Sequence, residues 1–214
     1  INCIYPSDLV PFTRRPLFLV IDGDNNEAFG AINGAEKGET VAILLSPRTS
    51  YHCTNADSPH HSGSLFTAFL TAPLQAFCLL LGLTGSDVEM DTYFKAERLL
   101  SSSLNDWGLN LAALDSLHPV WAQILGDPFL RRLVLRFLFC RAVLTLHAPT
   151  FNKKEFIPKC VPSLPASLLP STVTCQTLIM QIANIFGATD SFIFSEHFVL
   201  TENIHGYTDS MSSS

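Results

Sequence analysis

Charged residues are scarce in this sequence of 214 residues: only 15% are charged, against 47% that are hydrophobic, and the formal net charge is −6. A net negative charge argues against nucleic-acid binding by the whole domain, since such binding needs a basic surface. The length allows one compact domain with a sizeable core, or two small ones. We therefore expect a folded protein that makes no direct contact with nucleic acid.

Sequence motifs for catalysis, cofactor binding and export are also missing. The six cysteines form no CxxC pair, and the glycines form neither a GxGxxG nor a Walker A loop. No GxSxG nucleophile elbow, Asn-x-Ser/Thr sequon or signal peptide is present. We therefore expect a reducing intracellular environment, no cofactor, no metal, no catalytic residue and no enzyme activity.

A long uncharged stretch covers residues 62–86, and residues 65–83 are numerous enough to span a bilayer. Pro73, Gln75 and three threonines interrupt it, and no cluster of Lys or Arg flanks it. A helix buried on all sides in a protein core has the same pattern. We expect such a buried helix and no membrane contact.

Two short apolar runs, 17–21 and 41–45, predict buried strands, and residues 25–33 predict a short helix between them. This order indicates a βαβ unit with parallel strands. Further along we expect a helix over 64–81, capped by Ser64, and one over 88–107, capped by Asp87. A short helix over about 120–125 follows Asp115 or Ser116, and a long helix over 128–147 follows Asp127. The last expected helix covers 171–186. An extended segment over 153–170 and a last strand over 192–194 complete the expected elements.

The predicted fold class is therefore α/β, with a small, mostly parallel sheet and a dominant layer of long helices. We expect residues 1–207 to form one domain, the C-terminal part of a longer protein, and residues 208–214 to form a disordered tail.

Asp22 and Asp24 follow the first predicted strand, where α/β proteins hold Mg²⁺, so a metal-dependent phosphohydrolase is one alternative. Asp22 would then be the nucleophile and Asp24 the general acid. That mechanism also needs a nearby hydroxyl, a lysine and a second acidic cluster, and we find no such set in the sequence. We favour a strand-to-helix turn in which Asp24 caps the helix.

Two other groups of residues could bind ligands. His52, Cys53, Asp57, His60 and His61 lie close together, but their spacing matches no structural zinc pattern, so a solvated loop is expected.

Arg132, Arg136 and Arg141 lie at intervals of about four residues on the apolar helix over 128–147. They could face a phosphate backbone, an acidic partner or carboxylates of the same fold, and we favour the carboxylates.

Three long blocks give the sequence a family resemblance. YPSDLVPFTRRPLFLVID (5–22), GSLFTAFLTAPLQAF (63–77) and GDPFLRRLVLRFLFC (126–140) resemble the SCAI proteins, named for suppression of cancer cell invasion. The resemblance runs from about Ile4 to Phe194 and matches the C-terminal part of a typical member. Stretches such as SSSLNDWG (101–108) and LHPVWAQILG (117–126) are most similar to plant members.

The resemblance implies a non-catalytic cofactor that resides in the nucleus, with the cytoplasm as a second location. Animal members are described as transcriptional corepressors that bind a myocardin-related coactivator and serum response factor and oppose Rho-dependent transcription and cell migration. They are also linked to repair of DNA double-strand breaks through protein partners. The family has no catalytic or metal-binding residue to carry over, so none is assigned.

Overall fold

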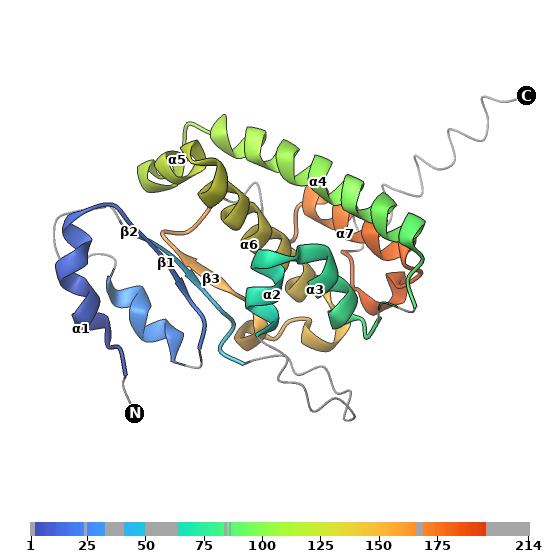
Figure 1. The fold of residues 1–214 in the computed structure, drawn as a ribbon, viewed down its shortest axis with the longest axis horizontal. Coiled ribbons are helices and arrows are strands. Elements are labelled where there is room, and N and C mark those ends of the chain that lie inside the picture. The colour runs from blue at the N-terminus through green and yellow to red at the C-terminus, as the bar shows by residue number, and fades with distance from the viewer. Residues whose placement is uncertain are drawn as a thin grey trace, which may run out of the picture.

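The computed structural model describes residues 3–23, 25–32, 41–49, 64–83, 85, 87–165 and 169–195. Its centre is a three-stranded sheet in the order β1 (Leu17–Ile21), β2 (Val41–Leu45) and β3 (Lys159–Val161) (Figure 1). β1 and β2 are parallel over their full length, as the βαβ pattern predicted. β3 lies antiparallel to β2, with Leu44 opposite Cys160, so the sheet is mixed.

The middle strand β2 separates two hydrophobic cores. Because side chains alternate along a strand, Ala42 and Leu44 point into the large core beneath the helices. Val41, Ile43 and Leu45 point to the other face and form a small core with Ile32. All five residues of β2 are buried, which explains why this strand reads as a continuous apolar run.

Short helical segments cover the small-core face: α1 (Pro6–Leu9), and the 3-10 helices η1 (Val10–Arg14) and η2 (Asn26–Ile32) (Figure 1). The helix expected between the two strands is therefore a 3-10 helix within the predicted range. Asp24, which was expected to cap this helix, lies outside the described residues.

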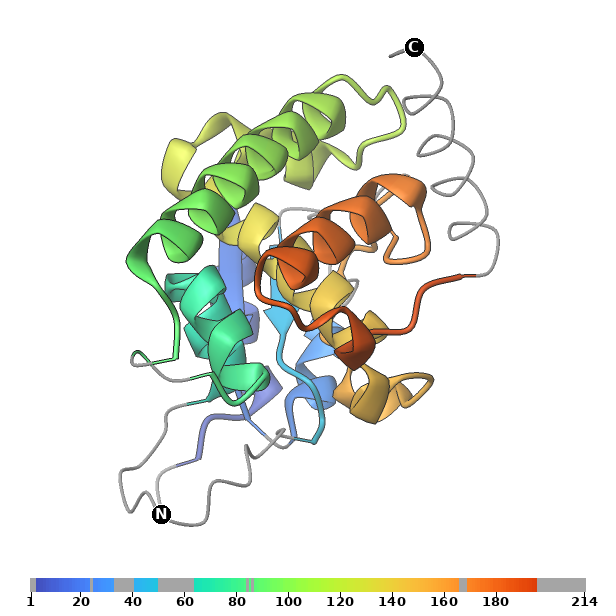
Figure 2. The same ribbon diagram turned by 90° about the vertical axis from the view of Figure 1, so that its right-hand side faces the viewer.

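Long helices cover the other face, as predicted. They are α2 (Leu65–Thr71), α3 (Pro73–Leu80), α4 (Met90–Ala112), α5 (Pro119–Gly126), α6 (Pro128–Leu146) and α7 (Val173–Ile185). Helix α6 is the centre of this layer and packs against α2, α3, α4, α5 and α7 (Figure 2). Short 3-10 helices η3 (Ala148–Thr150), η4 (Lys154–Phe156) and η6 (Thr189–Ser191) lie in the connections.

Local signals set the starts of the two helices that the sequence predicted best. Asp127 caps α6, because its Oδ1 accepts hydrogen bonds of 2.9 Å from the N–H groups of both Phe129 and Leu130, and Pro128 takes the first helical position. Thr172 caps α7, where its Oγ1 accepts a 3.4 Å hydrogen bond from the N–H of Cys175.

The single helix expected over 64–81 is wrong. The backbone leaves the helical region at Ala72, with φ −138° and ψ 74°, and a new helix starts at Pro73. A proline ring disfavours helical geometry at the residue before it, so Ala72 ends α2. Gly82, at φ 72°, follows the end of α3 and stops the helix.

Three helix boundaries also differ from the expectation. Glu89 rather than Asp87 is the N-cap residue of α4, and the helix continues five residues beyond the predicted end at Trp107. Gly108 therefore lies inside α4. This glycine contacts the Leu135 side chain of α6, and a larger residue there would crowd the contact between the two helices. The third is the start of α5: this helix begins at Pro119, one residue before the expected start, and His118 is its N-cap residue.

The last strand, expected over 192–194, is reduced to a single bridge between His147 and Phe192. The N–H of Ile193 donates a 2.7 Å hydrogen bond to the carbonyl of Leu146, which fixes this segment to the end of α6. The tail over 208–214 lies outside the described residues. None of the helices in the described part of the chain is long and apolar enough to cross a membrane.

Candidate functional site

Asp22 lies just beyond β1, where the phosphohydrolase alternative placed its nucleophile. Its Oδ2 accepts a 2.7 Å hydrogen bond from Thr67 Oγ1 of α2, so the carboxylate joins the strand end to the helical layer. The cavity between Asp22, Ser46 and Phe66 has a volume of about 20 Å³, which holds about one water molecule. Asp22 also lines an open hollow of about 480 Å³ beside β1.

The turn that follows Asp22 is held by Ser46 and the buried Asn26. Asn26 Nδ2 donates to the Ser46 carbonyl at 2.5 Å and to Ser46 Oγ at 2.8 Å. Ser46 Oγ also accepts a 3.2 Å hydrogen bond from the N–H of Gly23. Among the described residues no group of three His, Cys, Asp or Glu side chains could hold a metal ion. Nothing in this turn favours the phosphohydrolase alternative.

The histidine-rich group His52, Cys53, Asp57, His60 and His61 lies outside the described residues. Two other histidines lie at helix ends. His118 Nδ1 accepts a 3.3 Å hydrogen bond from the N–H of Val120. His147 is buried after α6, and burial lowers its pKa from 6.5 to about 4.

Arg136 does not pair with a carboxylate, in contrast to the expectation for the arginines of α6. Its Nη1 donates to the carbonyls of Leu70 at 2.9 Å and Thr71 at 2.7 Å. These carbonyls belong to the last turn of α2 and lack partners within their own helix, so the guanidinium caps that helix end. Burial, followed by the nearby charge of Arg132, lowers the pKa of Arg136.

The other two arginines of the stripe also form no ion pair with a described carboxylate, since both ion pairs in the described part of the chain involve Glu27. Arg132 lines a cleft between α3, α4 and α6, whose wall includes Glu97. Arg141 points towards β3, and its Nε is buried without a hydrogen-bond partner. Arg136 lines the same cleft as Arg132, whereas Arg141 lines a different cleft beside β3.

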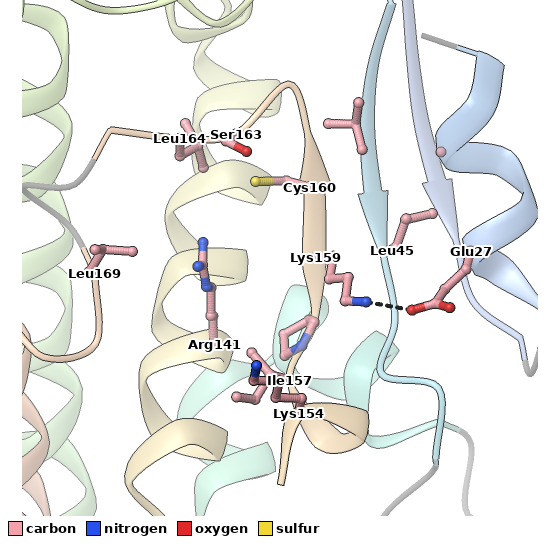
Figure 3. A pocket seen from close by; sticks show the side chains of 13 residues that line it. Glu27, Leu45, Arg141, Lys154, Ile157, Lys159, Cys160, Ser163, Leu164 and Leu169 are labelled. Atoms are coloured by element: carbon pink, nitrogen blue, oxygen red, sulfur yellow. Dashed lines mark hydrogen bonds and ion pairs between the residues drawn. The ribbon is translucent and has the colours of Figure 1, made fainter. Parts of the chain in front are cut away.

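A cleft of about 750 Å³ surrounds the outer edge of β3 (Figure 3). Figure 3 shows Arg141 on the α6 side of β3, whereas Lys159 and Glu27 lie on the other side of the strand. Apolar side chains form much of its wall, namely those of Leu45, Ile157, Pro158, Val161, Leu164 and Leu169. Its size and mixed lining are typical of a binding cleft.

The cleft is lined by more positive than negative side chains. Glu27 binds Lys159 by a hydrogen-bonded ion pair and Arg48 at 3.4 Å, and the Lys159 hydrogen bond is the main cause of the lowered Glu27 pKa. No described acid pairs with the other two cations of the cleft, Arg141 and Lys154. Burial raises the pKa of the Cys160 thiol, and the positive charge of the nearby Arg141 opposes that rise.

Sequence reasoning missed this cleft. Glu27 and Lys159 are 132 positions apart, and the strand that brings them together has only three residues. The available signal was the pair of prolines around residues 158–162, which correctly indicated an extended segment but not its neighbours.

Comparison with known proteins gives a consistent result. The family model described as "Protein SCAI" matches residues 1–151. Protein SCAI of mouse and that of human are each 34% identical to the chain over 191 residues, covering 89% of this chain and 30% of each relative. The SCAI homolog of Dictyostelium discoideum is 31% identical over 193 residues, covering 90% of this chain and 24% of the relative. No solved structure matches.

Proposed function

The chain belongs to the SCAI family, and on this basis we propose that it is a non-catalytic regulatory protein that acts by binding other proteins. The observation that carries the proposal is the family match, which covers 89% of the chain with the mouse relative. The chain spans about 30% of the length of that relative, so the activity of the whole protein is part of the proposal.

In its finer form the proposal is a corepressor-like cofactor of transcription that resides in the nucleus and also in the cytoplasm. The family resemblance supports a negative effect on Rho-dependent transcription and cell migration, and an alternative part in DNA repair through protein partners. In both cases the chain would meet DNA only through other proteins.

The cleft around β3 is the surface that we propose for partner binding. Its uncompensated cations, Arg141 and Lys154, lie beside apolar wall residues such as Ile157 and Leu164. A complementary segment carries a carboxylate next to apolar side chains, because opposite charge then meets opposite charge within an apolar groove. We therefore propose an acidic, partly apolar peptide segment of a protein partner.

A reporter assay tests the regulatory role. The full-length protein that contains this chain is fused to a sequence-specific DNA-binding domain and placed upstream of an active promoter. We expect reporter transcription to fall, and to recover when residues 1–195 are deleted from the fusion. Unchanged transcription with the fusion present in nuclei would contradict a corepressor role.

A charge-reversal pair tests the cleft separately. Lys154→Glu places an acid at the rim of the cleft, whereas Lys95→Glu makes the same change on an exposed position of α4. A random peptide library displayed on phage is selected against the chain and both variants. We expect acidic-apolar peptides to be enriched on the wild type and on Lys95→Glu, and to be lost on Lys154→Glu. Equal enrichment of these peptides on all three proteins would contradict the proposal that the cleft binds them.

A further inference from the structure

The two edges of the sheet are built differently. The β3 edge is only three residues long, is flanked by Pro158 and Pro162, and carries the exposed Lys159. Short length, proline and lysine are the usual features that stop an edge strand from pairing with another chain. β1 is also preceded by a proline, Pro16, but it is longer and carries no lysine: its five residues are all apolar, and Val20 is 40% exposed.

The outer edge of β1 also presents free backbone groups. The N–H of Ser46 donates a 2.9 Å hydrogen bond to the carbonyl of Ile21, so Ile21 directs its backbone groups towards β2. Because this direction alternates along a strand, Phe18 and Val20 direct theirs away from β2. In the described part of the chain no strand pairs with this side of β1.

Apolar hollows lie beside β1 on both faces of the sheet. One, of about 480 Å³, is lined mainly by apolar side chains, including those of Leu9, Leu19 and Phe29, and also by the polar Asp22, Asn25 and Asn26. The other, of about 300 Å³, lies between β1 and the α5–α6 region and is lined by Leu17, Phe18, Val120, Ile124 and Leu130. A strand added at this edge could place its alternating side chains beside both hollows.

We propose that β1 pairs with β1 of a second copy of the chain, antiparallel and centred on Leu19. In this register Phe18 of each copy lies opposite Val20 of the other, so the outward N–H and C=O groups of both residues find partners. The two sheets then form one continuous sheet with both helical layers on the same face. This inference goes beyond the proposed function and does not depend on it.

The charges at the two ends of β1 support a second copy as the occupant. Arg14 and Arg15 precede the strand, and the exposed Asp22 follows it. Antiparallel pairing places the basic end of each strand beside the acidic end of the other, whereas parallel pairing would place like charges together. The strand itself carries no charge that would repel its own copy.

The oligomeric state gives the first test. Light scattering coupled to size exclusion, at increasing protein concentration, should give a mass approaching twice the 23.5 kDa of one chain. Val20→Lys puts a charge on the paired edge and should return the protein to a monomer. A monomer at all concentrations, or a dimer that persists in Val20→Lys, would overturn the proposal.

Cross-linking tests the register and does not depend on the folding of Val20→Lys. In a Cys3→Ser, Cys53→Ser background, Leu19→Cys should form a disulfide between copies, since the central pair of this register brings the two Cα atoms to about 4.5 Å. Val20→Cys is the matched control: it is exposed but faces Phe18 of the second copy, so it should not cross-link. Equal cross-linking of the two variants, or none with Leu19→Cys, would overturn the pairing.

Discussion

At the scale of single residues, the buried polar side chains of this protein fix connecting segments to helices. Gln176 of α7 donates from Nε2 to the Ser171 carbonyl at 2.8 Å and accepts a 2.8 Å hydrogen bond from the N–H of Ser195. Thr150 donates from Oγ1 to the Leu144 carbonyl at 2.6 Å. Such bonds repay the cost of burying a polar group and define where each connection runs.

His147 makes stability depend on pH. Its folded pKa of about 4 lies below the ordinary 6.5 because burial disfavours the charged ring. As pH falls below 6.5 the unfolded chain binds a proton at His147 and the folded chain does not, so the free energy of unfolding decreases as the pH falls from 6.5 towards 4. We expect a loss of about 1–2 kcal/mol between pH 7 and pH 5, allowing for partial solvent screening.

Urea denaturation at the two pH values measures this loss. His147→Gln has no ring to titrate, so its free energy of unfolding should change less between pH 7 and pH 5 than that of the wild type, whatever its absolute stability. An equal change in both proteins would assign the pH dependence to other groups.

At the scale of elements, the break between α2 and α3 is held by a residue of a third helix. The last turn of α2 ends at Thr71, and the guanidinium of Arg136 in α6 binds two of its carbonyls. Hydrogen bonds from a charged donor are stronger than neutral ones, and the bond to the Leu70 carbonyl is partly buried, where a lost partner is costly. The bend therefore depends on α6 as well as on Pro73.

Arg136→Met should lower the free energy of unfolding by about 1–3 kcal/mol, because it removes both hydrogen bonds to the end of α2 while keeping much of the side-chain packing. Arg132→Met, one turn earlier on the same helix, is the control, and we expect it to change stability by less than about 0.5 kcal/mol. Chemical denaturation of the three proteins gives the comparison. Similar losses in the two variants would mean that net charge on α6, rather than the cap, controls stability.

The elements that the sequence predicted well carry their own signals. The apolar runs of β1 and β2 are confirmed at both ends, and Asp127 with Pro128 marks the start of α6. β3 carries no such signal, because its three residues are ordered by pairing with β2. The same holds for Arg136: its partners could be identified only once the chain was known to bend at Ala72. Local sequence signals therefore predicted most of the helices and strands. The cleft around β3 and the contacts of Arg136 depend on segments far apart in the sequence, so local signals could not predict them.

At the scale of the whole molecule, the sheet divides the protein into two unequal parts. The large core extends through helices α2 to α7. Phe77 lies at its centre: the centroid of its ring is 5.4 Å from that of Phe192, 6.0 Å from that of Phe186 and 6.2 Å from that of Phe139. Among the described residues, the small core has four buried members. On that side α1 and η1 contain no buried residue.

This inequality predicts two levels of protection from hydrogen exchange. Amides of α1 and η1 should exchange by local opening, because little buried apolar surface holds these segments, whereas amides in the middle of α6 should exchange only on global unfolding. Phe77→Ala should destabilise the large core by about 3–5 kcal/mol and so speed exchange in α6 by roughly 100-fold or more, while α1 keeps its rate. Leu9→Ala, on the small-core side, should speed exchange near α1 and leave α6 unchanged. Hydrogen exchange followed by mass spectrometry distinguishes these patterns: if either variant speeds exchange equally in α1 and α6, the two sides of the sheet unfold as one unit and the division into unequal parts is wrong.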